Sequence, residues 1–413
     1  MNSVLAPAPA PALRPDHELR LLKGGEALFP ALIEAITAAR AEVLLETYIF
    51  EFDRSVVPVA QALEQAAARG VTVRVIVDGV GTGDVPAEWV QRWRAAGVKW
   101  HVFNPARGWR VLFPKRWRRL HRKLCVVDGS VAFCGGINLL DDYFDPNHGA
   151  LERPRLDFAV RVTGPLVADV HDTMTRLWSR VQLMRGARER DLEGALQAVR
   201  IAARAGVERV DSAAGVARNA VAALVLRDNF RYRRRIEGTY RLAIAQARSE
   251  ILIANAYFIP GVQLQRALLR AARRGVRITL LLQGRYEYFM QYHASRAVYG
   301  MLLDAGIEII EYEASFLHAK VAVMDSTHGA ALATVGSSNL DPFSLLLARE
   351  ANVFVRNDAF AAELRSHLLQ AMAQQGRRVE PEAHLHRPLV TRALSWVAYG
   401  LMRMALLITG KKY

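Results

Sequence analysis

The sequence has 413 residues, of which 52% are hydrophobic, so it is long enough for two domains and is not that of a disordered protein. Its formal net charge of +15 predicts an anionic partner, and the candidates are nucleic acid, anionic lipid and a phosphorylated substrate. The cysteines, Cys125 and Cys134, are too few for a disulfide framework or a cysteine-rich zinc site.

The first segment, residues 1–16, is rich in Pro and Ala and lacks the apolar core of a signal peptide. We expect a disordered tail there. No run of about 18 uninterrupted apolar residues occurs in the sequence, so we do not expect a membrane-spanning helix.

An internal repeat then covers most of the chain. Ala35–Phe50 matches Ala243–Ile259, and Ala66–Gly79 matches Arg270–Gly284. Each segment joins a helix pattern to a β-branched run that is typical of a buried strand. The repeat predicts an α/β fold of two tandem, pseudo-symmetric domains, each a mixed, mostly parallel sheet flanked by helices. We place the domains at residues 17–183 and 221–380, a linker at 184–220 and a C-terminal segment at 381–413.

An insert, Asn104–Leu120, interrupts the first repeat and has no counterpart in the second. Basic residues drawn to an anionic surface, with aromatic rings at headgroup depth, favour membrane docking. The same composition also fits single-stranded nucleic acid, whose bases stack on aromatic rings. The residues singled out for contact are Trp109, Arg116, Trp117, Arg118 and Arg119.

A motif of the form HxKxxxxD follows the insert, with His121, Lys123 and Asp128 at its fixed positions. On a strand, His121 and Lys123 share one face and lie about 7 Å apart. Asp128 has the opposite parity and precedes Gly129, a pair that is typical of a tight turn. We therefore expect Asp128 to hold the end of the strand rather than to do chemistry.

A second copy repeats the spacing with His318, Lys320 and Asp325, and each copy leads into a Gly- or Ser-rich turn that ends in Asn138 or Asn339. Glycines let backbone N–H groups approach an anion, and Lys and Asn donors can hold phosphate oxygens. The two copies therefore predict one phosphate-binding active site between the halves. It requires no metal and no cofactor.

An acidic residue follows each motif on the next predicted strand, Asp157 in the first half and Glu350 in the second. Such an acid can bind an imidazole and fix its tautomer, although both acids could instead be solvated strand-end residues. With a histidine from each half, one imidazole can attack phosphorus while the other protonates the departing alcohol.

The C-terminal segment has the pattern of an amphipathic helix. Arg392, Ser395, Tyr399 and Arg403 form one polar stripe, and leucines and valines cover the rest. Trp396 and the terminal lysines favour a helix that lies in a membrane interface, and the alternative is a helix packed on the protein's own core.

These motifs resemble those of the phospholipase D superfamily, and segments such as EVLLETYIF and VGSSNLDPFSLLLAREANV resemble bacterial cardiolipin synthases of the shorter type. The resemblance implies two phospholipase D-like domains and makes the six motif residues the catalytic set. His121 and His318 become the nucleophile and the general acid/base, with phosphate bound by Lys123, Asn138, Lys320 and Asn339. It also implies that Asp157 and Glu350 orient the histidines, although many superfamily members carry Asp where this chain has Glu350.

We therefore expect a metal-independent phosphatidyl transferase that acts on phospholipids through a phosphohistidine. It would move a phosphatidyl group from phosphatidylglycerol or a similar donor to a lipid alcohol. We expect it to lie peripherally on the anionic, cytoplasmic face of a bacterial inner membrane, with no nucleic-acid partner and no prediction of oligomeric state. The alternatives are a hydrolytic phospholipase D or nuclease, and a nucleic-acid-binding protein without activity.

The resemblance favours His121 as the nucleophile. An independent argument is that Asp157, the shorter acid, lies in the same half as His121. We expect it to hold that imidazole more rigidly than the longer Glu350 holds His318, and in-line attack needs the tighter alignment.

Overall fold

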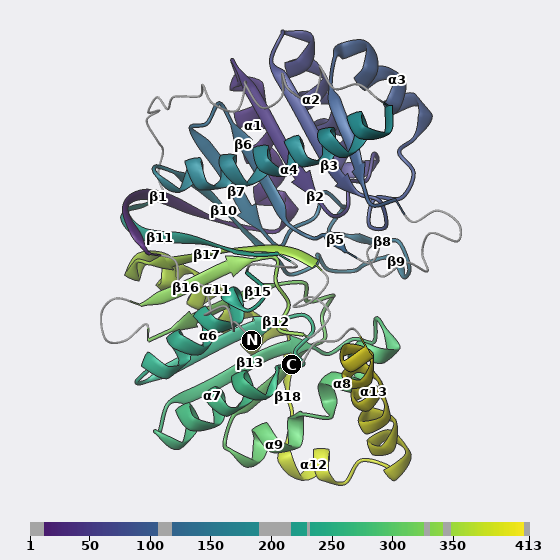
Figure 1. Ribbon diagram of the computed structural model, residues 1–413. Helices are drawn as coiled ribbons and strands as arrows, with labels where there is room; N and C mark the ends of the chain where they lie inside the picture. Colours follow the sequence, from purple (N-terminus) through teal and green to yellow (C-terminus); the bar gives the residue numbers. More distant parts are fainter. Residues whose placement is uncertain are drawn as a thin grey trace, which may run out of the picture.

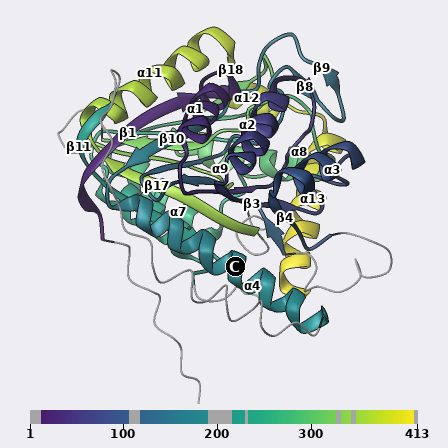
Figure 2. The same ribbon diagram turned by 90° about the horizontal axis from the view of Figure 1, so that it is seen from above.

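The computed structural model describes residues 12–105, 118–189, 216–228, 232–325, 331–341 and 348–408. Its two halves stand one above the other in Figure 1, and a mixed sheet of 16 strands runs through both. Viewed from above, α1 and α2 lie on one side of the strands and α4 on the other (Figure 2). The α/β architecture and the tandem halves predicted from the repeat are confirmed.

The first half follows the predicted alternation of strands and helices and ends with the motif hairpin, the strand that follows it and a long helix. Its elements are β1 (Arg14–Lys23), α1 (Gly24–Ala38), β2 (Glu42–Thr47), η1 (Arg54–Val56), α2 (Val57–Ala68), β3 (Thr72–Asp78), α3 (Ala87–Ala96), β4 (Lys99–Phe103), β5 (Arg119–Leu120), β6 (Lys123–Val127), β7 (Val131–Gly135), β8 (Phe144–Asp145), β9 (Gly149–Ala150), β10 (Phe158–Thr163) and α4 (Leu166–Glu189).

The second half repeats the order and then adds a short strand and two helices. Its elements are β11 (Ala217–Arg227), α6 (Arg235–Gln246), β12 (Glu250–Asn255), α7 (Val262–Arg273), β13 (Arg277–Gln283), α8 (Phe289–Arg296), α9 (Tyr299–Asp304), β14 (Glu308–Tyr312), β15 (Lys320–Met324), β16 (Leu332–Gly336), β17 (Ala348–Arg356), α11 (Asp358–Gln375), β18 (Gly376–Arg378), α12 (Pro381–Leu385) and α13 (Leu389–Ile408).

The strand order is symmetric about the β1–β11 pair. It reads β18-β14-β13-β12-β15-β16-β17-β11-β1-β10-β7-β6-β2-β3-β4, with β5 pairing β17. Because β1 and β11 pair antiparallel, the two predicted domains share one sheet. The expectation of a mostly parallel sheet is wrong in detail. Among the described strands, antiparallel pairs predominate because both motif hairpins and their flanking strands pair antiparallel.

Two predicted boundaries also shift, because the pairing of β1 with β11 recruits residues from outside the repeat. β1 starts at Arg14, inside the segment expected to be a tail, and β11 starts at Ala217, inside the expected linker. The helix-to-strand junctions match the prediction, since Gly70 and Gly275 end their helices with φ of +93° and +87°. This left-handed conformation carries little penalty for glycine.

The core explains why the halves are held together. One cluster combines α4 side chains, such as Val170, with α11 side chains, such as Leu364, and with strands from both halves. Two outer clusters belong to one half each, around α1 and α2 in the first and around α6 and α7 in the second. The motif hairpins therefore lie where both halves pack, and the shared core fixes their relative position. Among the described residues, no helix is both long and apolar enough to cross a bilayer.

Candidate active site

Each motif histidine lies two residues before the start of a fully buried strand. His121 precedes β6 and His318 precedes β15, and the side chains of these strands pack into the core on both faces. Core packing therefore fixes the backbone at both sites, while the imidazoles keep 14% and 19% of their surface exposed. The Tyr48 ring lies beside His121, with 4.8 Å between ring centroids.

Each acid binds the histidine of the other half. His121 Nδ1 lies 3.0 Å from Glu350 Oε1, and His318 Nδ1 lies 2.6 Å from Asp157 Oδ2. Both carboxylates are buried, so they are not the solvated strand-end acids of the alternative reading. The assumption that Asp157 holds the histidine of its own half is wrong. In each case Nδ1 is engaged and Nε2 is left for a substrate.

Backbone hydrogen bonds also join each histidine to the opposite half, and they explain why each acid reaches the histidine of the other half. The His121 N–H donates to the Arg349 carbonyl at 3.1 Å, and the His318 N–H donates to the Leu156 carbonyl at 2.9 Å. Arg349 and Leu156 each directly precede an acid, so the start of each post-motif strand runs beside the opposite motif. This arrangement brings each acid to the opposite histidine.

Two residues that the motifs do not predict, Asp78 and Gln283, hold the residue before each histidine. Asp78 Oδ2 accepts the Leu120 N–H at 2.7 Å, and Gln283 Oε1 accepts the Leu317 N–H at 2.9 Å. Asp78 ends β3 and Gln283 ends β13, so they occupy equivalent places in the repeat. Both precede a glycine in the matched segments, and a polar residue ending each buried strand was the available signal.

The residue two before each motif asparagine differs between the halves. Gly136 lies under Asp157, and a Cβ built on it would come within 2.4 Å of Asp157 Oδ1. Its counterpart, Ser337, donates from Oγ to Glu350 at 2.5 Å. The shorter acid is therefore matched with glycine and the longer acid with a hydrogen-bonding serine.

The two acids also differ in acidity. Burial raises the pKa of Asp157 to about 7, although Lys320 and the Phe158 N–H oppose the rise. Burial also disfavours the ionised Glu350, but His121, Lys123 and Ser337 more than offset it and hold the pKa of Glu350 below its ordinary value. Burial lowers the pKa of both histidines, and the motif lysines together with Arg155 lower that of His318 further.

The motif lysines are buried, and their ammonium groups lie beside the histidines. Lys123 Nζ donates to the His121 carbonyl at 2.8 Å, and Lys320 Nζ donates to the His318 carbonyl. Burial lowers the pKa of Lys123 to about 7 and that of Lys320 to about 8. A bound phosphodiester anion would restore favourable interactions for both ammonium groups, so the site has the electrostatics of an anion pocket.

The motif asparagines are also buried. Asn138 Oδ1 accepts the Ile49 N–H at 3.3 Å, whereas Asn339 Oδ1 is a buried atom for which the described residues supply no partner. Within the described residues, no group of three or more His, Cys, Asp and Glu side chains could hold a metal ion.

The motif aspartates do the structural work expected of Asp128. Its carboxylate accepts the backbone N–H groups of Arg40, Ala41 and Glu42 at 2.8 Å, and Asp325 accepts those of Arg248 and Ser249. Both aspartates have positive φ, at the turn of their hairpins. They tie each hairpin to the junction between a helix and a strand, a whole strand away from the histidine.

Of the residues expected to contact a membrane, some lie outside the described residues, one is largely buried and one is exposed. Trp109, Arg116 and Trp117 lie outside the described residues. Arg119 is corrected, because its side chain is only 16% exposed and its guanidinium binds Asp78 at 3.1 Å and the Asn104 carbonyl. Trp396, by contrast, is 60% exposed.

Comparisons with known proteins agree with this geometry. A family model described as "Cardiolipin synthase, PLD-like domain" matches residues 32–153 and 240–372. Cardiolipin synthase B of Escherichia coli K12 is 36% identical over 89% of this chain and 83% of its own length. Cardiolipin synthase A of Pseudomonas fluorescens Pf-5 is 30% identical over 89% of this chain and 71% of its own. A phosphatidylserine synthase structure from Haemophilus influenzae shares the fold, with a TM-score of 0.59 and 12% identity over 92% of this chain and 95% of its own.

Proposed function

The chain belongs to the cardiolipin synthase family with phospholipase D-like domains, and from this we propose how its two histidines transfer a phosphatidyl group. The protein is a phosphatidyl transferase of the cardiolipin synthase type, and its substrates are phospholipids. Phosphatidylglycerol or a similar lipid is the proposed donor, and a lipid alcohol is the proposed acceptor.

In the first step, His121 Nε2 attacks the phosphorus of the donor, and a P–N bond forms as the bond to the departing alcohol breaks. Ionised Glu350 holds the Nδ1 proton of His121, which keeps the Nε2 lone pair directed outwards. His318 protonates the departing alkoxide. The phosphodiester charge beside Lys123 and Lys320 offsets the cations that otherwise keep His318 neutral.

In the second step, the acceptor hydroxyl gives its proton to His318 Nε2 and attacks phosphorus, and the P–N bond breaks. Lys123, Lys320, Asn138 and Asn339 hold the phosphoryl oxygens through both steps, where negative charge develops. The observation that carries this proposal is the crossed pairing, since Nδ1 of both histidines is engaged by a buried carboxylate from the other half.

A hydrolytic phospholipase D uses the same first step and releases the phosphatidyl group to water. Incubating the purified protein with phosphatidylglycerol, with or without phosphatidylethanolamine or glycerol, and identifying products by mass spectrometry separates the two reactions. We expect a phosphatidyl group joined to a lipid alcohol, with phosphatidic acid as a minor product. Phosphatidic acid as the only product would assign the protein to the hydrolases.

We also propose that α13 holds the protein on an anionic membrane, at the cytoplasmic face. Its inner side, with Ser395, Ala398 and Met402, is buried, and the last two pack against Ile259 and Ala294. Its outer side exposes large apolar side chains, including Leu389, Val390, Trp396, Val397 and Leu401. An exposed apolar stripe of this size is typical of an interaction surface.

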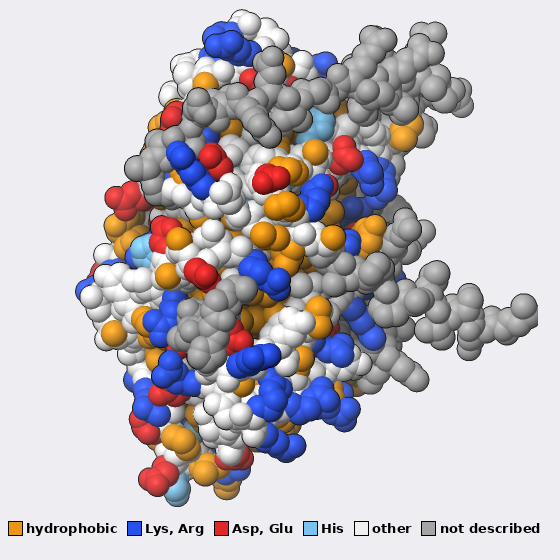
Figure 3. Space-filling model, turned by 90° about the vertical axis from the view of Figure 1, so that its left-hand side faces the viewer, with side chains coloured by type: hydrophobic (Ala, Val, Ile, Leu, Met, Phe, Trp, Pro, Cys, Tyr) orange, Lys and Arg blue, Asp and Glu red, His pale blue; other side chains and the backbone are white. Residues whose placement is uncertain are grey.

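Basic side chains also lie on a face away from α13, the left-hand side of Figure 1. Figure 3 shows Lys and Arg side chains spread over one face and gathered over its lower part, where the second half lies. On α7, Arg266, Arg270 and Arg273 are exposed, and their charges add to the long-range attraction between the second half and an anionic surface.

Substitution on the outer side of α13 tests this contact. Changing Val390, Val397 and Leu401 to Ser should reduce binding to phosphatidylglycerol-containing vesicles at least about tenfold, because each side chain loses apolar contact with the bilayer. The thermal midpoint should stay unchanged, since these side chains face outwards. Unchanged vesicle binding would contradict the proposed contact.

A further inference from the structure

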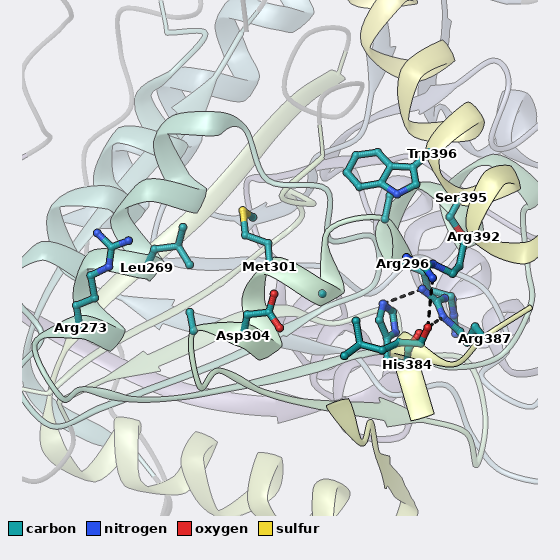
Figure 4. Close-up of a pocket in the computed structure, with 14 residues that line it drawn as sticks. Leu269, Arg273, Arg296, Met301, Asp304, His384, Arg387, Arg392, Ser395 and Trp396 are labelled. Carbon is teal, nitrogen blue, oxygen red and sulfur yellow. Dashed lines mark hydrogen bonds between the residues drawn. The ribbon is translucent and has the colours of Figure 1, made fainter. Parts of the chain in front are cut away.

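A second cavity lies at the C-terminal end of the second half, between α7, α9, α12 and α13. It is open to solvent on one side and has a volume of about 660 Å³, and none of the residues of the histidine site lines it. Figure 4 shows Arg296, Arg387, Arg392, His384 and Trp396 converging at one end, with Leu269 and Arg273 at the other.

The charges of this cavity are not balanced by its own carboxylates. Arg296 is buried and bound to Glu311 at 2.5 Å, but Glu311 is shared with Arg377. Asp304 is the one acidic side chain among the lining residues. The remaining lining cations therefore exceed the lining anions.

The partners of Arg387 and Arg392 are neutral among the described residues. Arg387 donates to the His384 carbonyl at 3.1 Å and to His384 Nε2 at 2.7 Å. Arg392 donates to the Leu385 carbonyl at 3.4 Å, a long hydrogen bond that leaves most of its guanidinium available.

The titration of the cluster reflects the same excess of positive charge. Burial and the charges of Arg387, Arg296 and Arg392 lower the pKa of His384 to about 4, so this imidazole is neutral and accepts a hydrogen bond from Arg387 through Nε2. Burial and the charge of Arg296 lower the pKa of Arg387. An anion in the cavity would relieve both effects.

The cavity also adjoins the exposed apolar stripe of α13. Trp396 lines the cavity and is 60% exposed, and Leu385, which also lines it, is 53% exposed. The next outward side chain along α13, Val397, is 57% exposed. A ligand held by the arginines would therefore extend onto an apolar surface.

We propose that this cavity binds the headgroup phosphate of an anionic phospholipid, with the acyl chains lying along the outer side of α13. The phosphate of a phospholipid would neutralise the arginines, and its acyl chains would cover the exposed apolar side chains of α13. Free phosphate would do only the first, and an apolar peptide would do only the second.

Such a site would hold one lipid molecule apart from those being converted. It would fix the depth and orientation of the second half on the membrane, because α13 also packs against α8. The site does not depend on the reaction assigned to the histidines.

The test uses the full-length chain carrying His121→Ala and His318→Ala, so that no ligand is converted. Trp396 emission is titrated with dihexanoyl-phosphatidylglycerol below its critical micelle concentration, with Trp396→Phe protein as the blank. Inorganic phosphate and dihexanoyl-phosphatidylcholine are titrated in parallel.

We expect saturable binding of dihexanoyl-phosphatidylglycerol, and about tenfold weaker binding after Arg392→Gln, because a charge-assisted hydrogen bond is lost. Arg403→Gln is the matched control, since Arg403 lies on the same exposed helix and does not line the cavity. It should change the affinity less than twofold. Arg387→Gln should weaken binding as Arg392→Gln does, and an unchanged thermal midpoint together with an unchanged Trp396 emission spectrum before ligand is added shows that the cavity remains folded.

Three results would overturn the proposal. The first is the absence of any change in Trp396 emission. The second is an equal loss in the Arg392→Gln and Arg403→Gln proteins, which would indicate general surface attraction. The third is phosphate binding as tight as phosphatidylglycerol binding, which would identify a free-anion site. Each is distinct from failure of the transfer reaction, because the protein in this test is inactive.

Discussion

The two halves share a scaffold, a His–Lys spacing and an Asn-terminated turn, but they hold the two histidines differently. His121 is held by Glu350, which receives a second hydrogen bond from Ser337, whereas His318 is held by Asp157, which lies over Gly136. The pKa of Glu350 is held below its ordinary value and that of Asp157 is raised to about 7. A duplicated scaffold can therefore acquire two roles through small changes around the acids.

This difference bears on which histidine attacks. A nucleophile needs a partner that stays ionised, as Glu350 does, and a general acid needs a pair that can carry a proton near neutrality. Asp157 does not hold His121, yet the crossed pairing leads to the same choice of His121 as nucleophile by a different physical route.

The largest expected effect is the loss of either histidine. His121→Ala and His318→Ala should each reduce turnover by about 10⁴-fold or more, because both act on the reacting atoms. With an activated donor whose leaving group needs no proton, His318→Ala should still form a phosphatidyl-enzyme and His121→Ala should not. Acid quenching, digestion and mass spectrometry locate the adduct, and an adduct on His318 in the His121→Ala protein would reverse the assignment.

The first half contains a buried ion pair that the second half lacks, and this pair should contribute to the free energy of unfolding. Arg122 binds Glu46 at 2.7 Å, whereas the equivalent positions in the second half are Ala319 and Ala254. Glu46→Ala or Arg122→Ala alone should cost about 3 kcal/mol of unfolding free energy, because one buried charge is left unpaired. The double substitution should cost much less. Urea unfolding of the four proteins measures the coupling, and additive losses would show that the pair is not a unit.

The crossed pairing predicts which step each acid supports. Glu350→Gln and Asp157→Asn should each lower turnover about 10²-fold, since both orient a histidine. With the activated donor, only Glu350→Gln should slow formation of the phosphatidyl-enzyme, because Glu350 holds the nucleophile of the other half. If Asp157→Asn slowed formation of the phosphatidyl-enzyme instead, the result would indicate that each acid acts on the histidine of its own half.

The combination of glycine and Asp157 in the first half can be changed to the combination of serine and glutamate found in the second half. Gly136→Ser should lower activity about tenfold by pushing on Asp157, since the new Cβ has no room. Adding Asp157→Glu should recover part of that loss, because the pair then matches Ser337 and Glu350. The initial rates of the single and double variants test this. A double variant that is slower than both single variants would show that the residue at position 136 and the acid at position 157 do not compensate for each other.

The smallest expected effect is a pH dependence. Because the pKa of Asp157 is raised, the His318–Asp157 pair holds its proton below about pH 7 and loses it as pH rises through that value. In the absence of bound substrate the pair is less able to protonate the leaving group above this range, so kcat/KM should fall about fivefold between pH 7 and pH 8. Asp157→Asn should shift or abolish this limb, and Glu350→Gln should leave it in place.

Local and repeating features could be predicted from the sequence. The repeat located the strands, the helices that end at Gly70 and Gly275, and the structural role of Asp128, because these depend on short-range periodicity and turn chemistry. The crossed acids could not be found this way. Their partners lie 161 and 229 residues away, and only the packing of the two halves decides which histidine each acid reaches.

Two other differences between the predicted and the observed structure also result from long-range packing. The basic neighbours of Arg119 predict a membrane contact, but β5 pairs with β17 and places the Arg119 side chain against Asp78. The alternation predicts a strand before the first helix of each half, but the residues of β1 and β11 could not be located, because neither lies in a segment that the repeat matches. Each is held as a strand by long-range pairing, β1 with β10 and β11, and β11 with β1 and β17.

The crossed acids have a consequence for synthesis of the chain on the ribosome. Domains generally fold as they emerge, N-terminal part first. A nascent chain that has exposed only the first half would carry His121 without the carboxylate at position 350, and Asp157 without the imidazole at position 318. No partly made chain could then attack phospholipids, and activity would begin only when both halves are complete.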